Sequence, residues 1–394
     1  MTDGALPRHP DRWPSFPELA AAVGAPTAGV AGPPWRAPDG TVTNVLVGSD
    51  STLAGAAWVP LASVEVPGLA DSWSAWADGF AGDGRAAWFV RGWVESVVSW
   101  IDSLGLDRVG PPEPVKLWSL SAVLRIPVAT GELFFKATCD GFRTEPALTS
   151  VVRRLAPDVA PALVAVDEER GWMLMAPIPG ASDGVPAAQA ADVARRLARL
   201  QLDTLPARPA LLAAGVPDRG LEATLAMLGT VVHASVDVLT DEQRARAVAI
   251  EPWLVTAVRD FWSAGLPDVL AHGDLHLGNV AWVDDGPLLF DWTDACLTHP
   301  FLDAKHLADS AASDGADDGL REVVWAAYAE AWRAACPDVD LDAVWARVRV
   351  AEGVFQAVTY EQIYRAQPEG SRWELATVVG EILDKLADVR DGRR

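Results

Sequence analysis

The sequence HGDLHLGN, residues 272–279, is the most informative part of the chain, together with the pattern that follows it as far as Asp291. Two short apolar runs come after Asn279, and the turn signal Asp-Asp-Gly-Pro separates them. This pattern predicts a hairpin, which brings Asn279 and Asp291 opposite each other at one end. Asp274 lies on the loop that leads into the hairpin. The sequence therefore predicts that two carboxylates and one amide side chain converge.

These segments resemble the catalytic and metal-binding segments of the aminoglycoside phosphotransferase family, the small-molecule relatives of protein kinases. The resemblance implies that Asp274 is the catalytic base and that Asn279 and Asp291 hold magnesium. Phosphoryl transfer needs a metal ion to neutralise phosphate oxygens and a carboxylate to orient the nucleophile, and oxygen ligands suit Mg²⁺. Without the family, the segment would be a strand, a loop and a hairpin with polar residues at the solvent end.

A second half of the predicted site lies upstream. Lys136 ends a hydrophobic strand, and Glu145 precedes a helix. Protein kinases pair a strand lysine with a helix glutamate to hold the α- and β-phosphates, and the resemblance implies the same roles here. In isolation, the two residues would be a strand-edge charge and a helix-start carboxylate favoured by the helix dipole. Pro146 places Glu145 at the helix cap, which departs from the kinase pattern.

The resemblance implies two more nucleotide-binding segments. The turn that contains Ser119 and Ser121 would cover the triphosphate with backbone amides and hydroxyls, although it has no glycine. The segment with Met175 and Ala176 matches the linker whose backbone pairs with adenine in kinases. An ordinary hairpin turn and ordinary core packing of methionine are the alternatives for these segments.

Downstream residues suggest a support for the catalytic loop and an acceptor pocket. By the resemblance, Asp303 is a buried carboxylate that hydrogen-bonds the catalytic loop, and we expect His272 to stabilise that loop. The acceptor pocket is expected around residues 305–365. Its candidate residues are Trp325, Tyr328, Tyr360 and Glu361. Four aspartates could meet a cationic acceptor or form a solvated face: Asp309, Asp314, Asp317 and Asp318.

The length of 394 residues suits two or three domains. We expect an α+β extension at 1–110, a β-rich lobe with a hinge at 111–180 and a helical lobe with the catalytic loop at 181–394. Helical spacing predicts a helix over about 93–104. Strands are expected at 115–118, 123–128, 133–138, 163–166 and 172–175. Helices are expected from about 146, at 188–202, within 220–262, and at 319–336, 341–364 and 373–389.

With the resemblance, this organisation implies an α+β, bilobal protein-kinase-like fold with an N-terminal extension. ATP and Mg²⁺ would bind between the lobes. The front extension departs from the shorter antibiotic kinases, and this speaks against antibiotic resistance as the native role.

Composition excludes several classes of protein. The net charge of −22 disfavours nucleic acid as a ligand. The three cysteines are too few and too scattered for a disulfide framework or a zinc site. We find no secretory signal and no apolar stretch long enough to span a membrane. We therefore expect a cytoplasmic protein, and the oligomeric state stays open.

The predicted function is an ATP-dependent phosphotransferase that moves the γ-phosphate to a hydroxyl of a small molecule. An aminoglycoside or amino sugar is the leading acceptor. A plain sugar, a choline-like alcohol or homoserine is the alternative, and a non-catalytic nucleotide-binding regulator is another. A protein kinase is disfavoured because no Ala-Pro-Glu segment follows Asp291.

Overall fold

The computed structural model describes most of the chain after residue 85 and four short strand segments before residue 49. The residues after 85 that it leaves out are 91, 182–184, 235–237, 314–318, 370–371, 373–374 and 394. The chain divides into two compact units. The first comprises Met1–Arg143, Leu163–Pro177 and Ala366–Glu374, and the second comprises Thr144–Ala162, Ile178–Arg365 and Leu375–Arg394.

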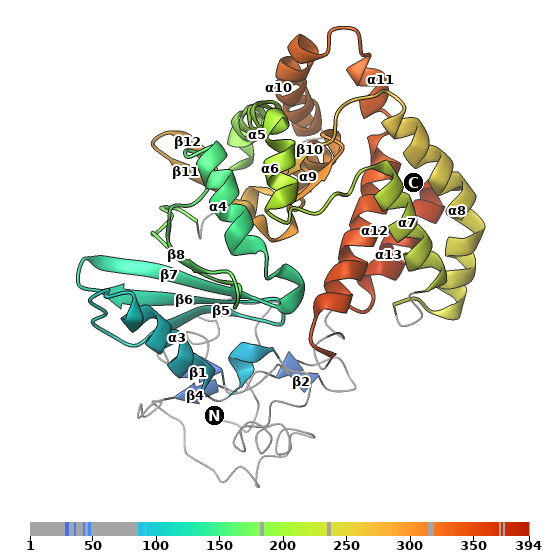
Figure 1. The fold of residues 1–394 in the computed structure, drawn as a ribbon. Helices are drawn as coiled ribbons and strands as arrows, with labels where there is room; N and C mark the ends of the chain where they lie inside the picture. The colour runs from blue at the N-terminus through green and yellow to red at the C-terminus, as the bar shows by residue number, and fades with distance from the viewer. Residues whose placement is uncertain are drawn as a thin grey trace. The chain divides into compact units, whose positions relative to one another are not determined.

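The first unit is built around a five-stranded antiparallel sheet with the order β5-β6-β7-β9-β8 (Figure 1). The strands are β5 (Glu113–Leu117), β6 (Ser121–Val128), β7 (Gly131–Thr138), β8 (Leu163–Asp167) and β9 (Trp172–Met175). All five strands expected between residues 115 and 175 are therefore confirmed. The strands of the front segment are β1 (Ala28–Val30), β2 (Trp35–Arg36), β3 (Val42–Thr43) and β4 (Leu46–Gly48).

One face of this sheet is covered by α3 (Trp93–Ser103), the helix that the apolar spacing predicts. Phe135 on β7 packs edge-to-face with Trp93 and Trp100, at ring-centroid distances of 5.9 Å in both cases, and with Trp172 at 5.4 Å. Because side chains alternate along a strand, Lys136 points to the opposite face. It is only 5% exposed. The tryptophan cluster thus fixes the strand that carries the lysine.

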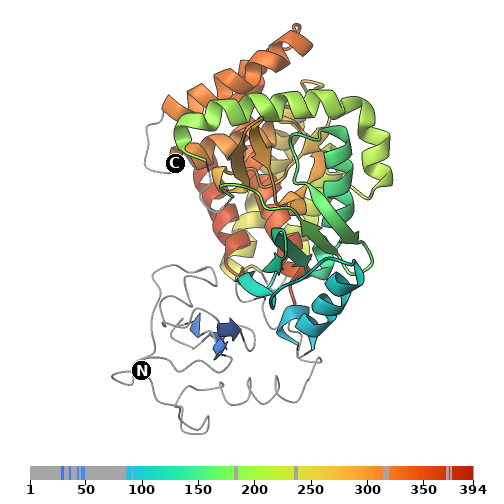
Figure 2. The same ribbon diagram turned by 90° about the vertical axis from the view of Figure 1, so that its left-hand side faces the viewer.

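The second unit is mainly helical. In one part, α5 (Ala190–Thr204) packs against α9 (Phe301–Ser313) and α10 (Gly319–Ala335) (Figure 2). Another group consists of α7 (Leu221–His233), α8 (Asp241–Trp262), α12 (Val348–Ala366) and α13 (Val378–Arg390) (Figure 1). The shorter helices are α6 (Arg208–Ala213) and α11 (Leu341–Trp345). The helix α4 (Glu145–Leu155), expected in the small lobe, groups with this unit.

Two small sheets flank the loop that contains Asp274. β10 (Val269–Ala271) pairs with β13 (Cys296–Thr298), and β11 (Val280–Val283) pairs with β12 (Gly286–Leu289). In the second pair Val283 lies opposite Gly286, so the turn falls at Asp284 and Asp285. The amide of Phe290 donates to the carbonyl of Asn279 at 3.0 Å. The predicted hairpin is confirmed, but its register places Phe290, the residue before Asp291, opposite Asn279 at the open end.

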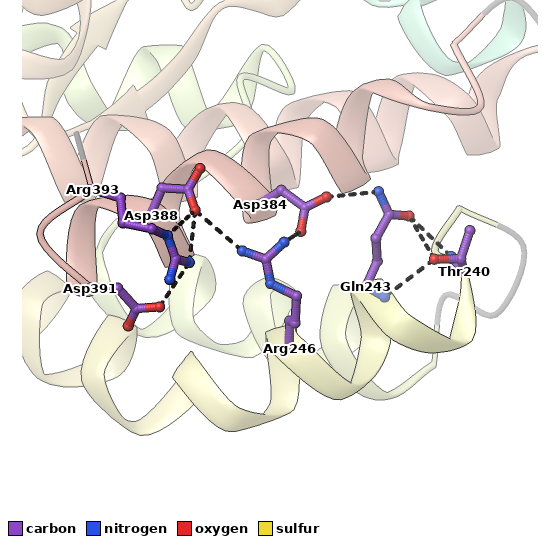
Figure 3. Close-up of polar contacts among 7 residues, drawn as sticks. All are labelled: Thr240, Gln243, Arg246, Asp384, Asp388, Asp391 and Arg393. Carbon is purple, nitrogen blue, oxygen red and sulfur yellow. Dashed lines mark hydrogen bonds and ion pairs between the residues drawn. The ribbon is translucent and has the colours of Figure 1, made fainter.

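Polar side chains tie α8 to α13 (Figure 3). Thr240 caps α8: its Oγ1 accepts from the amide of Gln243, and the Gln243 Oε1 accepts from the Thr240 amide. The Gln243 Nε2 also donates to Asp384 on α13 at 3.1 Å. Arg246 donates to Asp384 at 2.5 Å and to Asp388 at 3.4 Å. These contacts hold α13 against α8.

We predict that Asp384→Ala destabilises the protein by about 1 kcal/mol, because Gln243 and Arg246 lose their shared acceptor. The ion pair is partly exposed, at 37% for Arg246 and 31% for Asp384, so solvent limits its strength. Urea unfolding of the two single variants and the Arg246→Ala/Asp384→Ala double variant should give a coupling energy of about 0.5–1 kcal/mol. A coupling energy of zero would show that the pair contributes nothing.

Candidate active site

A buried carboxylate fixes the backbone of the loop that carries Asp274. Asp303, near the start of α9, is 2% exposed. Its Oδ2 accepts from the amide of His272 at 2.6 Å, and its Oδ1 accepts from the amide of Gly273 at 2.9 Å. Burial raises the pKa of Asp303, while the nearby His272 and these two hydrogen bonds favour the charged form and limit the rise. Asp303 therefore holds the loop by the backbone amides of two consecutive residues, His272 and Gly273.

The loop also requires a glycine. Gly273 has φ +86°, and a Cβ on it would lie 2.1 Å from the carbonyl oxygen of Asp294. Beside it, the His272 Nε2 donates to the carbonyl of Phe290 at 2.9 Å, and its ring lies 4.7 Å from that of Trp292. His272 thus ties the loop to the end of β12, next to Asp291.

Asp274 itself lies among three polar side chains, and its own side chain is 42% exposed. The Asn279 Nδ2 donates to the Asp274 carbonyl at 2.9 Å and lies 3.4 Å from Oδ2. The His306 Nε2 lies 3.1 Å from Oδ1, and the His276 Nε2 lies 3.8 Å from Oδ2. One carboxylate oxygen is therefore held by an imidazole, while the other faces an amide and a second imidazole.

The protonation of His276 follows from its contacts. Its Nδ1 accepts from the amide of Gly278 at 3.0 Å. Burial lowers the pKa of His276, so the ring is neutral near pH 7. A neutral ring that accepts at Nδ1 carries its proton on Nε2, the nitrogen that faces Asp274.

His306 bridges two carboxylates. Its Nε2 contacts Asp274, and its Nδ1 lies 3.6 Å from an oxygen of Glu352 on α12. Burial disfavours the charged ring, but the contacts with the carboxylates of Asp274 and Glu352 outweigh burial and raise the pKa of His306 to about 10. No sequence motif identifies this residue. The one signal is its place three residues after Asp303 on the same helix, which puts both on one face.

Asn279 and Asp291 could hold a metal. Asp291 has φ +65°, and it is the one non-glycine residue with positive φ in the part of the chain that the structure describes. The hydroxyl of Thr293 donates to Asp291 Oδ1. No cluster of three or more His, Cys, Asp or Glu with metal-site geometry occurs among the described residues. One amide oxygen and one carboxylate fit Mg²⁺, which takes its other ligands from phosphates and water.

A cavity of about 370 Å³ lies between α9, α12 and α13, all in the second unit. His306 and Glu352 belong to its wall, so the cavity borders the group around Asp274. Its lining residues are Lys305, His306, Asp309, Arg349, Glu352, Gly353, Gln356, Tyr360, Ile382, Lys385, Leu386 and Val389. The volume falls within the range of small-molecule pockets.

Only one of the four expected pocket residues lines this cavity. Tyr360 does so, and burial together with Asp274, Asp294 and Glu352 raises its pKa to about 12. Trp325 and Tyr328 are core residues, and Glu361 pairs with Arg365.

The aspartates that could meet a cationic acceptor do not form such a surface in the described residues. Asp309 lines the cavity, but it bonds with Lys305 and Arg321. Asp314, Asp317 and Asp318 lie outside the described residues.

The expected phosphate-binding residues of the first unit are buried. Lys136 lies in the middle strand of the sheet, opposite Val123 and Met173 in register. Glu145 opens α4 in the second unit and is also buried. Because the two residues belong to different units, their pairing stays a prediction.

The remaining nucleotide-binding candidates also lie in the first unit. Ser119 is fully buried, and its Oγ accepts from the Gln367 Nε2 at 2.7 Å. The Ser121 Oγ accepts from the Trp118 indole at 2.7 Å. Met175 ends β9 and is buried, and Ala176 follows it partly exposed. Both serine oxygens accept in these hydrogen bonds, so the hydroxyl protons are not used in them.

An antiparallel five-stranded sheet, a larger helical unit and the supported loop of Asp274 define a kinase-like fold. Two solved structures share it. A macrolide 2'-phosphotransferase type I has a TM-score of 0.52 and 18% identity, covering 75% of this chain and 97% of its own. The GDP complex of aminoglycoside 2'-phosphotransferase-IIIa has a TM-score of 0.52 and 16% identity, covering 75% and 98%.

The family model described as the phosphotransferase enzyme family matches residues 131–337, more than half of the chain. The chain belongs to this family, and the predicted resemblance and α+β, kinase-like fold are confirmed. A comparison with curated proteins gives no match. None of the helices among the described residues has the length and apolarity needed to cross a membrane.

We predict that Asp303→Asn costs about 2–3 kcal/mol of stability, because an amide cannot accept from both backbone N–H groups in the same pose. Thermal or urea unfolding measures this loss, and phosphoryl transfer should fall in parallel. The exposed Asp203 of α5 gives the matched control, since Asp203→Asn should change stability by less than about 0.5 kcal/mol. Equal stability of the two variants would contradict the anchoring role.

We predict that His306 stabilises the folded state in a pH-dependent way. Its pKa in the folded protein, about 10, lies above the 6.5 of an ordinary histidine. Its contribution is therefore complete below the lower value and is lost as pH rises through the higher one. The difference in unfolding free energy between wild type and His306→Gln should be larger at about pH 6 than above pH ~10. A difference that does not change with pH would contradict this assignment.

Proposed function

We propose that this protein is an ATP-dependent phosphotransferase that moves the γ-phosphate to a hydroxyl of a small molecule. The observation that carries the proposal is the placement of Asp274. Asp303 fixes its loop, Asn279 donates to it, and Asp291 directly follows Phe290, the residue bonded to Asn279 at the open end of the hairpin. A carboxylate beside oxygen donors for a metal is the arrangement that phosphoryl transfer requires.

In the proposed reaction, the acceptor hydroxyl approaches the γ-phosphorus and Asp274 takes up its proton. The new oxygen–phosphorus bond forms as the bond from the γ-phosphorus to the bridging oxygen of ADP breaks. Asn279 and Asp291 would hold Mg²⁺, which neutralises charge on the phosphates when it is bound.

The first unit would bind the nucleotide. Lys136 binds the phosphates of the nucleotide and is positioned by Glu145. The turn with Ser119 and Ser121 covers these phosphates. The backbone at Met175 and Ala176 pairs with the base. A deeply buried lysine on a central strand supports this role, since a charged ammonium inside a protein needs an anionic partner.

The acceptor would bind in the cavity between α9, α12 and α13. This cavity borders Asp274 through His306 and has a volume suited to a small molecule. The similar solved structures include macrolide and aminoglycoside phosphotransferases, which supports a small-molecule acceptor. We propose a cytoplasmic enzyme that binds neither nucleic acid nor membrane, consistent with its net charge of −22.

We predict that Asp274→Asn lowers acceptor-dependent ADP release by about 10²- to 10⁴-fold, the contribution of a positioned general base. Nucleotide binding should persist, because the substitution keeps the size of the side chain and its contact with Asn279. Release of ADP with a panel of hydroxyl compounds and nucleotide-induced thermal stabilisation measure the two effects.

The matched control is Asp285→Asn in the exposed turn of the same hairpin, which should retain the wild-type rate. Near-wild-type turnover of Asp274→Asn would refute the mechanism. Nucleotide binding by the wild type without transfer to any acceptor would favour a nucleotide-binding regulator instead.

A further inference from the structure

The cavity beside Asp274 is formed by single faces of three helices. Its residues on α12 recur every three or four positions from Arg349 to Tyr360, and those on α13 do so from Ile382 to Val389. Gly353 lets these helices approach closely, since a Cβ there would lie 2.7 Å from the Leu386 Cδ2. The residues of the wall therefore lie at regular positions on helices whose packing sets the distance between them.

The charges in this wall differ from those of the chain as a whole. When His306 is protonated, four lining residues carry a positive charge: Lys305, His306, Arg349 and Lys385. Two carry a negative charge: Asp309 and Glu352. The whole chain has a net charge of −22, and only four lysines occur in it. Two of those four lysines line this one cavity. Positive charge is therefore concentrated in this cavity, whereas the chain as a whole is strongly negative.

Both carboxylates in the wall already have cationic partners. Asp309 bonds with Lys305 and, at 2.9 Å, with Arg321. Glu352 lies beside His306. These groups balance each other within the protein, so neither carboxylate is left to bind a cationic ligand.

Arg349 and Lys385 are different. Both are exposed at the cavity, from α12 and α13 respectively, and neither forms an ion pair or a side-chain hydrogen bond within the part of the chain that the structure describes. An arginine guanidinium matches a carboxylate or a phosphate with two parallel hydrogen bonds. A lysine adds a second positive charge that can approach the same anion.

We propose that the acceptor of the proposed phosphotransferase carries an anionic group, a carboxylate or a phosphate monoester, in addition to its hydroxyl. Arg349 and Lys385 bind the anion while the hydroxyl faces Asp274. Ile382, Leu386 and Val389 contribute apolar surface to the same cavity. This inference rests on the proposed function. It departs from the cationic amino sugar favoured by the sequence, because a polycation would meet two uncompensated positive charges.

The test uses acceptors in matched sets that differ in charge. One set pairs sugar acids with their neutral alditols, another pairs sugar phosphates with the parent sugars, and aminoglycosides form the cationic arm. ADP release is measured with the full-length protein, ATP and Mg²⁺. We expect kcat/KM to be at least about tenfold higher for the anionic member of a pair, the effect of one good charged hydrogen bond. The two sets distinguish a carboxylate from a phosphate.

Variants then assign the anion to its residues. Arg349→Gln and Lys385→Gln should each raise KM for the anionic acceptor by about ten- to a hundredfold. Arg347→Gln, an exposed arginine outside the cavity two residues before Arg349, should leave this KM unchanged. A higher KM for ATP with an unchanged acceptor KM would show that the two cations serve the nucleotide, and would overturn the proposal.

Binding without turnover separates the two levels of the argument. Thermal shifts with each acceptor are measured without ATP for the wild type and for Arg349→Gln. Anions that bind in an Arg349-dependent way but release no ADP would refute the phosphotransferase function while leaving the charge preference intact. Transfer to neutral or cationic acceptors in preference to anionic ones would refute the charge preference while leaving the phosphotransferase function intact. Failure of every anion to bind or react would overturn the inference.

Discussion

The carboxylate of Asp303 holds the loop on which the candidate active site depends. Taking a charged group out of water costs several kcal/mol, and the hydrogen bonds from the amides of His272 and Gly273 offset that cost. Gly273 adopts a positive φ beside the carbonyl of Asp294, where a Cβ would clash, so the loop requires glycine at this position. The same turn directs Asp274 toward Asn279. A residue that takes no part in the chemistry therefore fixes where the chemistry can occur.

The features that sequence alone predicted are those with local signals. The hairpin follows from the turn at Asp284 and Asp285, where two residues suffice to reverse the chain. The sequence predicts helices within 220–262, and the capping box with which α8 begins at Thr240 involves only neighbouring residues. The strand with Phe135 and Lys136 follows from alternation, which also assigns the two side chains to opposite faces. Each of these signals lies within a few residues of the structure that it specifies.

The features that sequence did not predict depend on contacts between distant segments. The helix expected over 341–364 is interrupted after Trp345, although no glycine or proline lies there; Trp345 stacks on Trp325 of α10 at 4.3 Å, which fixes α11 as a separate turn. His306 and Glu352 belong to different helices and reach Asp274 only in the folded unit. The cavity also requires α13, which α8 holds in place through Asp384. No local pattern encodes such positions.

The contact between Asp274 and His306 bears on how the base can act. A protonated imidazole that donates to one oxygen of a carboxylate fixes the orientation of that carboxylate. Orientation matters in the proposed reaction, because the transition state of phosphoryl transfer is loose and the attacking oxygen needs positioning more than early deprotonation. With Oδ1 held by His306, Oδ2 has only longer contacts, and we propose that it receives the hydroxyl proton. Glu352 on the far side of the ring keeps the imidazole charged and in place. The contact thus gives the proposed base a fixed direction, which suits a reaction limited by alignment.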